Sequence, residues 1–131
     1  MNRPVIYVFL NKSLQMSVGK ASAQAVHAAM MANVDIIDDT QRGEWKKAVH
    51  KTVIVLEARD EQHMRNIASY LVERAYAVHY IIDEGVNEIL PHTVTAMATT
   101  ILDKDSEDVE KAFSSFSLYR DVIKVNLEIN R

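Results

Sequence analysis

The chain has 131 residues, 48% of them hydrophobic, so it is long enough to form one domain with its own apolar core. It contains no cysteine, which excludes disulfides, thiolate metal sites and cysteine nucleophiles. Its net charge of −3 argues against a general nucleic-acid coat protein or duplex binder, which is usually strongly basic, but allows a local basic patch. Because there is no signal-peptide pattern and no apolar run of roughly 20 residues, we expect a cytoplasmic protein that does not bind membranes.

The first predicted element is a strand at residues 5–10, a continuous run of β-branched, aromatic and aliphatic side chains. Such a run is typical of a strand buried on both faces, and therefore of a central strand. Ser17 has the side chain of a helix N-cap, and the helix after it consists mostly of small residues and ends between residues 33 and 37. Ala23, Val26, Met30 and Val34 recur at helical spacing, and we expect this face of the helix to be buried.

The middle of the chain alternates strand and helix patterns. Thr40 is the expected N-cap of a short second helix, Asp60 that of an amphipathic third helix, and Ser106 that of a last helix. The predicted strands between these helices are residues 52–58, which we expect to be buried, residues 76–82, and the threonine-rich residues 94–102.

The last residues alternate apolar and polar side chains. Ile123, Val125, Leu127 and Ile129 share one face, which predicts a strand that lies at a sheet edge or pairs with another copy of the chain. The whole chain therefore reads as a single α/β domain, residues 1–131. We expect a mixed sheet of four core strands and a C-terminal edge strand, with helices packed on both faces. The connection between the third and fourth strands is too short for a parallel crossover, so these two should be antiparallel.

Two stretches hold candidate site residues. In the first, Lys20, Gln24 and His27 share a helix face, and a lysine in a first helical turn opposes the helix dipole unless an anion lies nearby. This face either hydrogen-bonds a neighbouring loop and solvent, or it faces an anionic substrate.

The second stretch is the loop after the third strand, where Asp83 and Asn87 are among several hydrogen-bond acceptors. An ordinary solvated turn fits this composition as well. Thr93 and Thr95 follow on one face of the next strand, where threonine is common in any case. The five histidines lack HxH or HxxxH spacing, so we expect no metal site.

Together these stretches resemble the archaeal–eukaryotic type (type 2) peptidyl-tRNA hydrolases. Residues 19–28, Gly-Lys-Ala-Ser-Ala-Gln-Ala-Val-His-Ala, match the family's Gly-Lys pair followed by Ala-x-Ala-Gln-x-x-His-Ala. Residues 83–95 correspond to its second signature, Asp-Ala-Gly-Arg-Thr-Glu/Gln-Ile-x-Pro-Gly-Ser/Thr-x-Thr. The resemblance covers about residues 4–117, and residues 118–131 form a C-terminal extension.

The resemblance implies hydrolysis of the ester between a peptide and the 3′ ribose of its tRNA, without a metal or organic cofactor. Lys20, Asp83 and Thr95 occupy the family's proposed catalytic positions, and Gly19, Gln24, His27, Asn87 and Thr93 fall at positions that contact the substrate. Ester hydrolysis needs an activated water and a positive group beside the developing oxyanion. Asp83 and Thr95 would serve the water, while Lys20 would stabilise the oxyanion or hold a terminal phosphate of the tRNA.

The second signature departs from the family pattern at several positions. Val86 and Asn87 replace the Arg-Thr pair, and His92 replaces a glycine. Two further functions therefore stay open: a catalytically silent member of the fold that acts as a binding or homodimerisation module, and a small-molecule acyl hydrolase.

Overall fold

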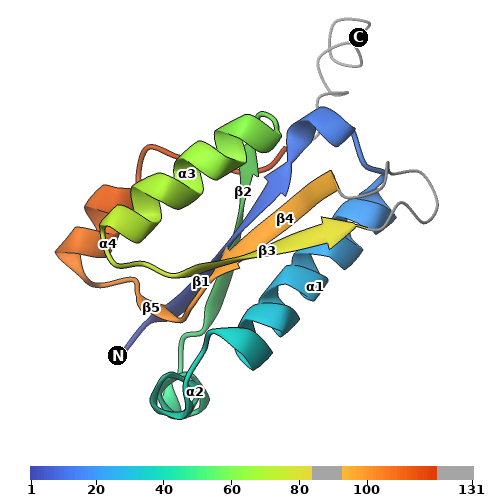
Figure 1. The fold of residues 1–131 in the computed structure, drawn as a ribbon. Coiled ribbons are helices and arrows are strands. Elements are labelled where there is room, and N and C mark those ends of the chain that lie inside the picture. The colour runs from blue at the N-terminus through green and yellow to red at the C-terminus, as the bar shows by residue number, and fades with distance from the viewer. Residues whose placement is uncertain (84–92, 121–131) are drawn as a thin grey trace, which may run out of the picture.

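The computed structural model describes residues 1–83 and 93–120, in which strands and helices alternate along the chain (Figure 1). The predicted strand around residues 123–129 lies outside the described residues. No helix in the described ranges is long and apolar enough to cross a membrane. The elements are β1 (Pro4–Asn11), a 3-10 turn (Lys12–Leu14), α1 (Val18–Asp35), α2 (Asp39–Lys47), β2 (Thr52–Ala58), α3 (Glu61–Glu73), β3 (Val78–Asp83), β4 (Thr93–Thr99), β5 (Leu102–Asp103) and α4 (Glu107–Phe113).

The sheet is mixed and has the order β2-β1-β4-β3, with the two-residue β5 paired to the start of β1. β1 runs parallel to β2 and antiparallel to β4, and all eight of its residues are buried, which confirms the prediction of a central strand. β3 and β4 are antiparallel neighbours, as their short connection predicts.

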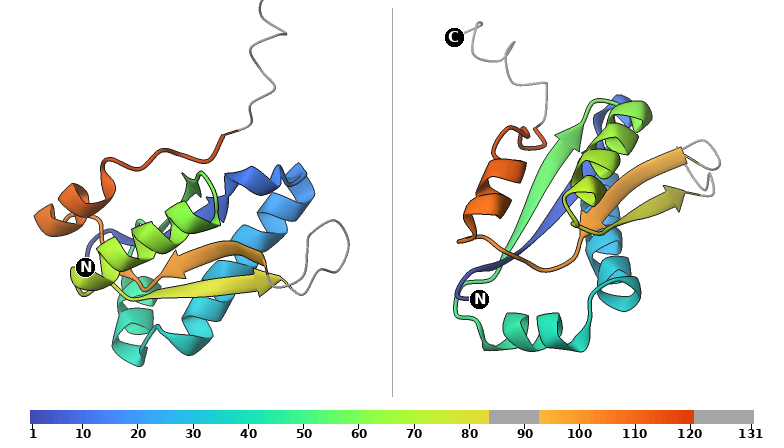
Figure 2. Two further views of the ribbon diagram at one scale, coloured as in Figure 1. Left: turned by 45° about the horizontal axis from the view of Figure 1, so that its top comes forward. Right: turned by 60° about the vertical axis from the view of Figure 1, so that its left-hand side comes forward.

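Helices cover both faces of this sheet, which confirms the α/β prediction (Figure 2). On one face, α3 and α4 enclose a core in which the rings of Tyr7 and Phe113 stack with centroids 3.9 Å apart. On the other face, α1 packs over β1, β3 and β4, where its contacts come from small side chains such as Ala28 and Ala32.

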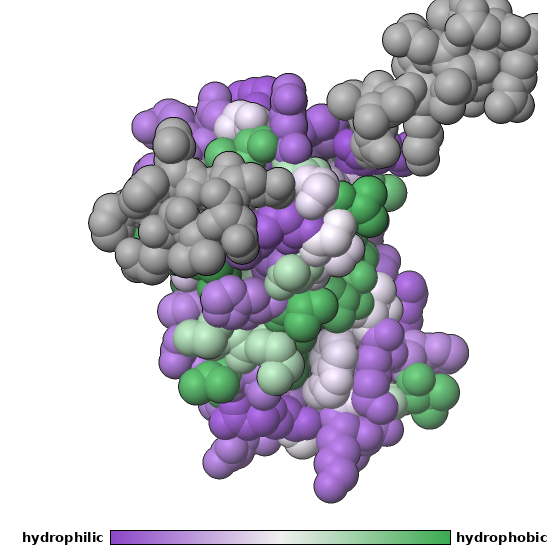
Figure 3. Space-filling model, turned by 90° about the vertical axis from the view of Figure 1, so that its right-hand side faces the viewer, coloured by the Kyte–Doolittle hydropathy of each residue, from purple (hydrophilic) through white to green (hydrophobic). Residues whose placement is uncertain are grey.

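The prediction of the buried face of α1 is wrong. Val26, Met30 and Val34 are 63%, 58% and 70% exposed, and Ala23 is exposed as well. The buried residues are Ala21, Gln24, Ala28 and Ala32. Small side chains let the helix backbone approach the sheet closely, so alanines, rather than the larger apolar residues, form the contact. Val26 and Met30 line an apolar hollow together with Val53 and Val55 of β2, and apolar residues are exposed on this side of the molecule (Figure 3).

The prediction of β2 as a buried strand is also wrong. β2 lies at the edge of the sheet, and Val53 is 48% exposed. An unbroken apolar run does not reveal whether a helix covers both of its faces. In the described structure α1 lies over β1, β4 and β3, so the α1-side face of β2 is partly open.

Two element boundaries differ from the prediction. Asp38, not Thr40, caps α2, because its carboxylate accepts the Gln41 N–H while the Gln41 side chain accepts the Asp38 N–H. The expected strand over residues 94–102 ends at Thr99, and its last residue, Leu102, belongs instead to β5, which pairs with β1.

Candidate functional site

The start of α1 has the N-cap that the sequence predicts. Ser17 Oγ accepts the Lys20 N–H at 3.2 Å, and the Ser17 carbonyl accepts the Ala21 N–H at 2.8 Å. A Cβ built on Gly19 would meet no atom within 4 Å. Glycine in a helix costs roughly 1 kcal/mol relative to alanine, and no packing in the described structure requires it here. No described atom therefore packs against the position that a side chain at Gly19 would occupy.

One turn further along α1, Gln24 joins this helix to β4. The Thr95 hydroxyl donates to Gln24 Oε1 at 2.7 Å, and both side chains are buried, Thr95 completely. Thr95 Oγ1 also lies 3.4 Å from the Ile81 carbonyl oxygen. This bond brings together the two stretches that the sequence analysis singled out, 71 positions apart in the chain.

A β-bulge in β4 turns Thr95 toward α1. Ile81 pairs with Ala96, but the next residue, Ile82, pairs with Val94, so Thr95 is an extra residue in its strand. A bulge of this kind re-aims a side chain and is common beside functional sites. Val94 therefore lies in the core under α3 and α4, while Thr95 reaches the Gln24 side chain on the other face.

Two side chains that the sequence analysis did not single out hold the backbone at this bulge. Asn11 is 1% exposed, and its Nδ2 donates to the Val94 carbonyl at 3.0 Å. From α3, Glu61 Oε1 accepts the Val94 N–H at 3.1 Å. Asn11 could have been noticed as a polar residue that directly follows the apolar run of β1. Nothing in the local sequence marks Glu61 as a contact of β4.

Lys20, Asp83 and Thr93 belong to the same end of the sheet. The backbone of Asp83 pairs with Thr93 at the end of β3. α1 runs in the same direction as β4. Near the start of both elements, Gln24 contacts Thr95. Near the end of both, Asp35 Oδ2 lies 3.2 Å from the Nε2 of His79, the residue that pairs with Ala98 of β4. Lys20 is one turn, about 6 Å, before Gln24, and Thr93 is about 7 Å before Thr95 in the same direction. The half-buried Lys20 thus lies at the level of the Asp83–Thr93 pair.

Two other predicted residues are not placed in the site. His27 is exposed on the surface of α1. Asn87 lies outside the described residues, together with Val86 and His92, and of Asp83 only the backbone is described. Within residues 1–83 and 93–120, no group of three histidine, aspartate or glutamate side chains is placed to bind a metal ion.

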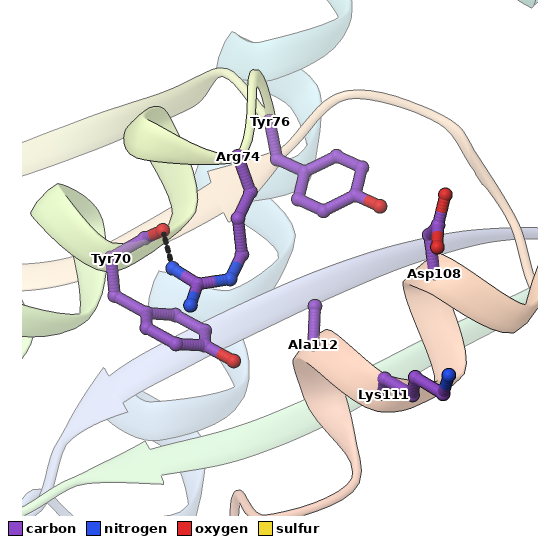
Figure 4. Close-up of a pocket in the computed structure, with 6 residues that line it drawn as sticks. All are labelled: Tyr70, Arg74, Tyr76, Asp108, Lys111 and Ala112. Atoms are coloured by element: carbon purple, nitrogen blue, oxygen red, sulfur yellow. Dashed lines mark hydrogen bonds between the residues drawn. The ribbon is translucent and has the colours of Figure 1, made fainter.

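A separate cavity of about 400 Å³ lies between the end of α3 and α4 (Figure 4). Arg74 stacks its guanidinium 3.6 Å from the centre of the Tyr70 ring and donates to the Tyr70 carbonyl oxygen at 2.8 Å. α3 begins beside Val94 and is 13 residues long, so this cavity is roughly 20 Å from the bulge. It contains none of the predicted site residues.

Comparison with known proteins links the chain to one family. The family model described as peptidyl-tRNA hydrolase PTH2 matches residues 5–119. A peptidyl-tRNA hydrolase of Pyrobaculum aerophilum is 29% identical over 119 residues, which cover 86% of this chain and 95% of that protein. One from Aeropyrum pernix is 29% identical over 97 residues, covering 70% of this chain and 77% of that protein.

Among solved structures, a protein of unknown function from Agrobacterium tumefaciens has a similar fold. The TM-score is 0.56 at 18% identity, and the alignment covers 92% of this chain and 100% of the other.

Proposed function

The chain belongs to the peptidyl-tRNA hydrolase PTH2 family, and from this membership we propose that it hydrolyses the ester between a peptide and the 3′ end of tRNA. The observation that carries the proposal is the hydrogen bond between Thr95 and Gln24, because it joins the two stretches that resemble the family's signatures. A translation substrate of this kind is consistent with action in the cytoplasm.

The reaction adds water across the ester. A water molecule attacks the carbonyl carbon, and the Asp83 carboxylate takes the proton of that water. The tetrahedral intermediate then collapses with cleavage of the bond to the ribose oxygen. The same proton returns to that oxygen, so the products are a peptide carboxylic acid and a tRNA with a free 3′ hydroxyl.

Lys20 and the first turn of α1 supply positive charge for this reaction. The Lys20 ammonium group and the outward N–H groups at the helix start favour an anion, either the oxyanion of the intermediate or a phosphate of the tRNA end. Gly19 adds no side chain that would obstruct such an anion, since the space around its Cα is open. Asn87, Thr93 and His27 remain proposed contacts of the substrate.

Thr95 has a positioning role in this proposal. Its side chain is 0% exposed, and it directs its hydroxyl proton to Gln24. A hydroxyl has one proton to donate, so this proton is not available to the substrate at the same time. Thr95 thereby holds α1, and with it Lys20, against the strand pair that carries Asp83.

Release of tRNA from a labelled peptidyl-tRNA tests the proposal. Lys20→Ala and Asp83→Asn should each lower kcat/KM by at least about 100-fold, the usual range for losing an acid–base or oxyanion group. Lys46→Ala, which removes a lysine in the last turn of α2, is the matched control and should leave the rate unchanged. Equal background rates for the wild type and both site variants would overturn the proposal.

Binding to tRNA separates the hydrolase from the silent module. A hydrolase that neutralises phosphates should bind tRNA more weakly as salt rises, whereas a module that binds only proteins or its own copy should show no salt-dependent affinity for tRNA. Because Val86 and Asn87 replace the Arg-Thr pair of the second signature, the activity of a variant that restores this pair is compared with that of the wild type. If activity appears only after Val86→Arg and Asn87→Thr are combined, the wild type is the silent module.

A further inference from the structure

At the bulge, side chains take the place of a neighbouring strand. The pairing of β1 with β4 ends at Leu10, opposite Ala96. Beyond it, the Val94 carbonyl oxygen accepts a hydrogen bond from the side chain of Asn11, the last residue of β1. Val94 is 1% exposed, so its N–H also needs a partner within the protein.

That partner comes from α3, which covers the face of the sheet opposite α1. Glu61 Oε1 accepts the Val94 N–H at 3.1 Å. The other oxygen of the same carboxylate, Oε2, accepts the Arg65 Nε–H at 3.2 Å and lies 3.1 Å from Arg65 Nη2. Arg65 follows Glu61 by one helical turn, so the two side chains are neighbours on α3. The guanidinium thus fixes the carboxylate in the orientation that leaves Oε1 to Val94.

Arg65 is held in turn by β3. Its guanidinium carbon lies 5.4 Å from the centre of the Tyr80 ring, a cation–π contact. Tyr80 packs against the core under α3, and Asp83 follows three residues later at the end of the same strand. The pair on α3 therefore contacts both strands that carry the candidate site: Glu61 contacts β4 at the bulge, and Arg65 contacts β3.

We propose that Glu61 and Arg65 are positioning residues of the proposed hydrolysis, acting from the far face of the sheet. They fix the bulge that aims Thr95 at Gln24, and this bond holds the start of α1 against the strand pair. The inference rests on the proposed function, in which neither residue contacts the substrate or the reacting atoms. Without the bond to Glu61 the bulge can shift, and a misplacement of about 1 Å in a catalytic group can lower a rate about 100-fold. The loss should therefore appear in kcat rather than in KM.

Two substitutions of Glu61 separate this role from a general effect on α3. Glu61→Ala and Glu61→Gln both remove the negative charge from the first helical turn, but the glutamine amide keeps an oxygen that can accept the Val94 N–H. In the tRNA-release assay, Glu61→Ala should lower kcat at least about 10-fold and change KM less than about 2-fold, whereas Glu61→Gln should keep most of the rate. Glu73→Ala, at the other end of α3, is the matched control and should behave as the wild type.

Arg65→Met tests the second half of the pair. It removes the guanidinium and keeps an apolar side chain beside Tyr80, so the Glu61 carboxylate remains but is free to turn. We expect kcat to fall about 3-fold to about 10-fold. Arg74→Met is the matched control, because Arg74 also stacks on a tyrosine, Tyr70, but at the far end of α3. Equal kcat values for the two arginine variants would overturn the role of Arg65.

Hydrogen exchange at the Val94 amide, followed by NMR, tests the geometry without using activity. Exchange should be at least about 10-fold faster in Glu61→Ala than in the wild type, because a bond to a charged acceptor is lost, and should stay close to the wild-type rate in Glu61→Gln. Equal exchange in all three proteins would overturn the proposal, and so would faster exchange without a lower kcat in Glu61→Ala. A wild type that releases no tRNA but shows the expected exchange would instead overturn the proposed function and leave Glu61 as the residue that holds the bulge.

Discussion

At the scale of single residues, the contact between Thr95 and Gln24 determines how the candidate site is assembled. Both side chains are buried, so removing either one takes a hydrogen-bond partner from the other. Asn11 and Glu61 hold the backbone of the intervening Val94 from two other elements. The bulge is thus stabilised by side chains from β1, α1 and α3 together.

Removing both partners should therefore cost less than the two single losses added together. Thr95→Val and Gln24→Leu should each lower the free energy of unfolding by about 1–3 kcal/mol, measured by urea denaturation. The double variant should lose less than the sum of the two, because no buried polar group is left without its partner. Thr95→Ser, which keeps the hydroxyl, serves as the control. Strictly additive losses would show that the bond contributes nothing beyond packing.

His63, near the start of α3, makes stability depend on pH. Its Nδ1 accepts the Arg59 N–H at 2.9 Å, and burial, followed by the charge of Arg59, holds the pKa of the imidazole below its usual value despite Asp60 and Glu57. In the unfolded chain the imidazole has its usual pKa of about 6.5, and in the folded protein its pKa is lower. Between these two pKa values the unfolded state binds more protons at His63 than the folded state does. The stability contributed by His63 is therefore complete above that pH and falls as the pH drops through this window.

The pH dependence should be visible in a substitution that does not titrate. Between about pH 7.5 and about pH 5.5, the wild type should lose more stability than His63→Asn, whose side-chain oxygen can still accept a hydrogen bond. Thermal unfolding across this range measures the difference. Parallel curves for the two proteins would show that His63 does not contribute to the pH dependence.

At the scale of elements, the close approach of α1 to the sheet sets the position of the site. Ala28 and Ala32 are completely buried against a sheet face that includes Ala96 and Ala98. Alanine on both sides brings the helix near enough for the Gln24 side chain to reach Thr95. Larger residues at these positions would push the helix outward and lengthen that contact.

Two alanines of α1 allow a matched test of this packing. Ala28→Leu should lower the free energy of unfolding by about 1–3 kcal/mol, because the added methyl groups have no space. Ala23→Leu adds the same groups on the exposed face and should change stability by no more than about 0.5 kcal/mol. Both values follow from denaturant unfolding. Similar effects at the two positions would contradict the assigned orientation of the helix.

At the scale of the whole molecule, the two faces of the sheet are covered unequally. α3 and α4 share one face with a core rich in aromatic contacts, whereas on the other face α1 lies along β1, β4 and β3. The molecule therefore has the candidate site at one end of α1 and an apolar groove along the side of the same helix.

The local sequence was sufficient for much of the fold. The apolar run of β1 correctly predicted a buried strand, Ser17 and Asp60 supplied the expected N-caps, and the short connection correctly predicted that β3 and β4 are antiparallel. The two family motifs marked Lys20, Gln24 and Thr95 before any geometry was known. The strand, the N-caps and the short connection depend on residues that are close together in the chain. Each motif is recognised from a short run of residues, without knowledge of the fold.

Only the tertiary structure decided which face of α1 is buried, that β2 lies at the edge, and that a bulge turns Thr95 toward Gln24. Helical periodicity shows that a face exists, but the shape of the opposing sheet selects small or large side chains for it. A bulge depends on the register of two strands, and the Thr95–Gln24 bond joins residues 71 positions apart. Contacts of this kind form only when the whole chain has folded, so no local pattern contains them.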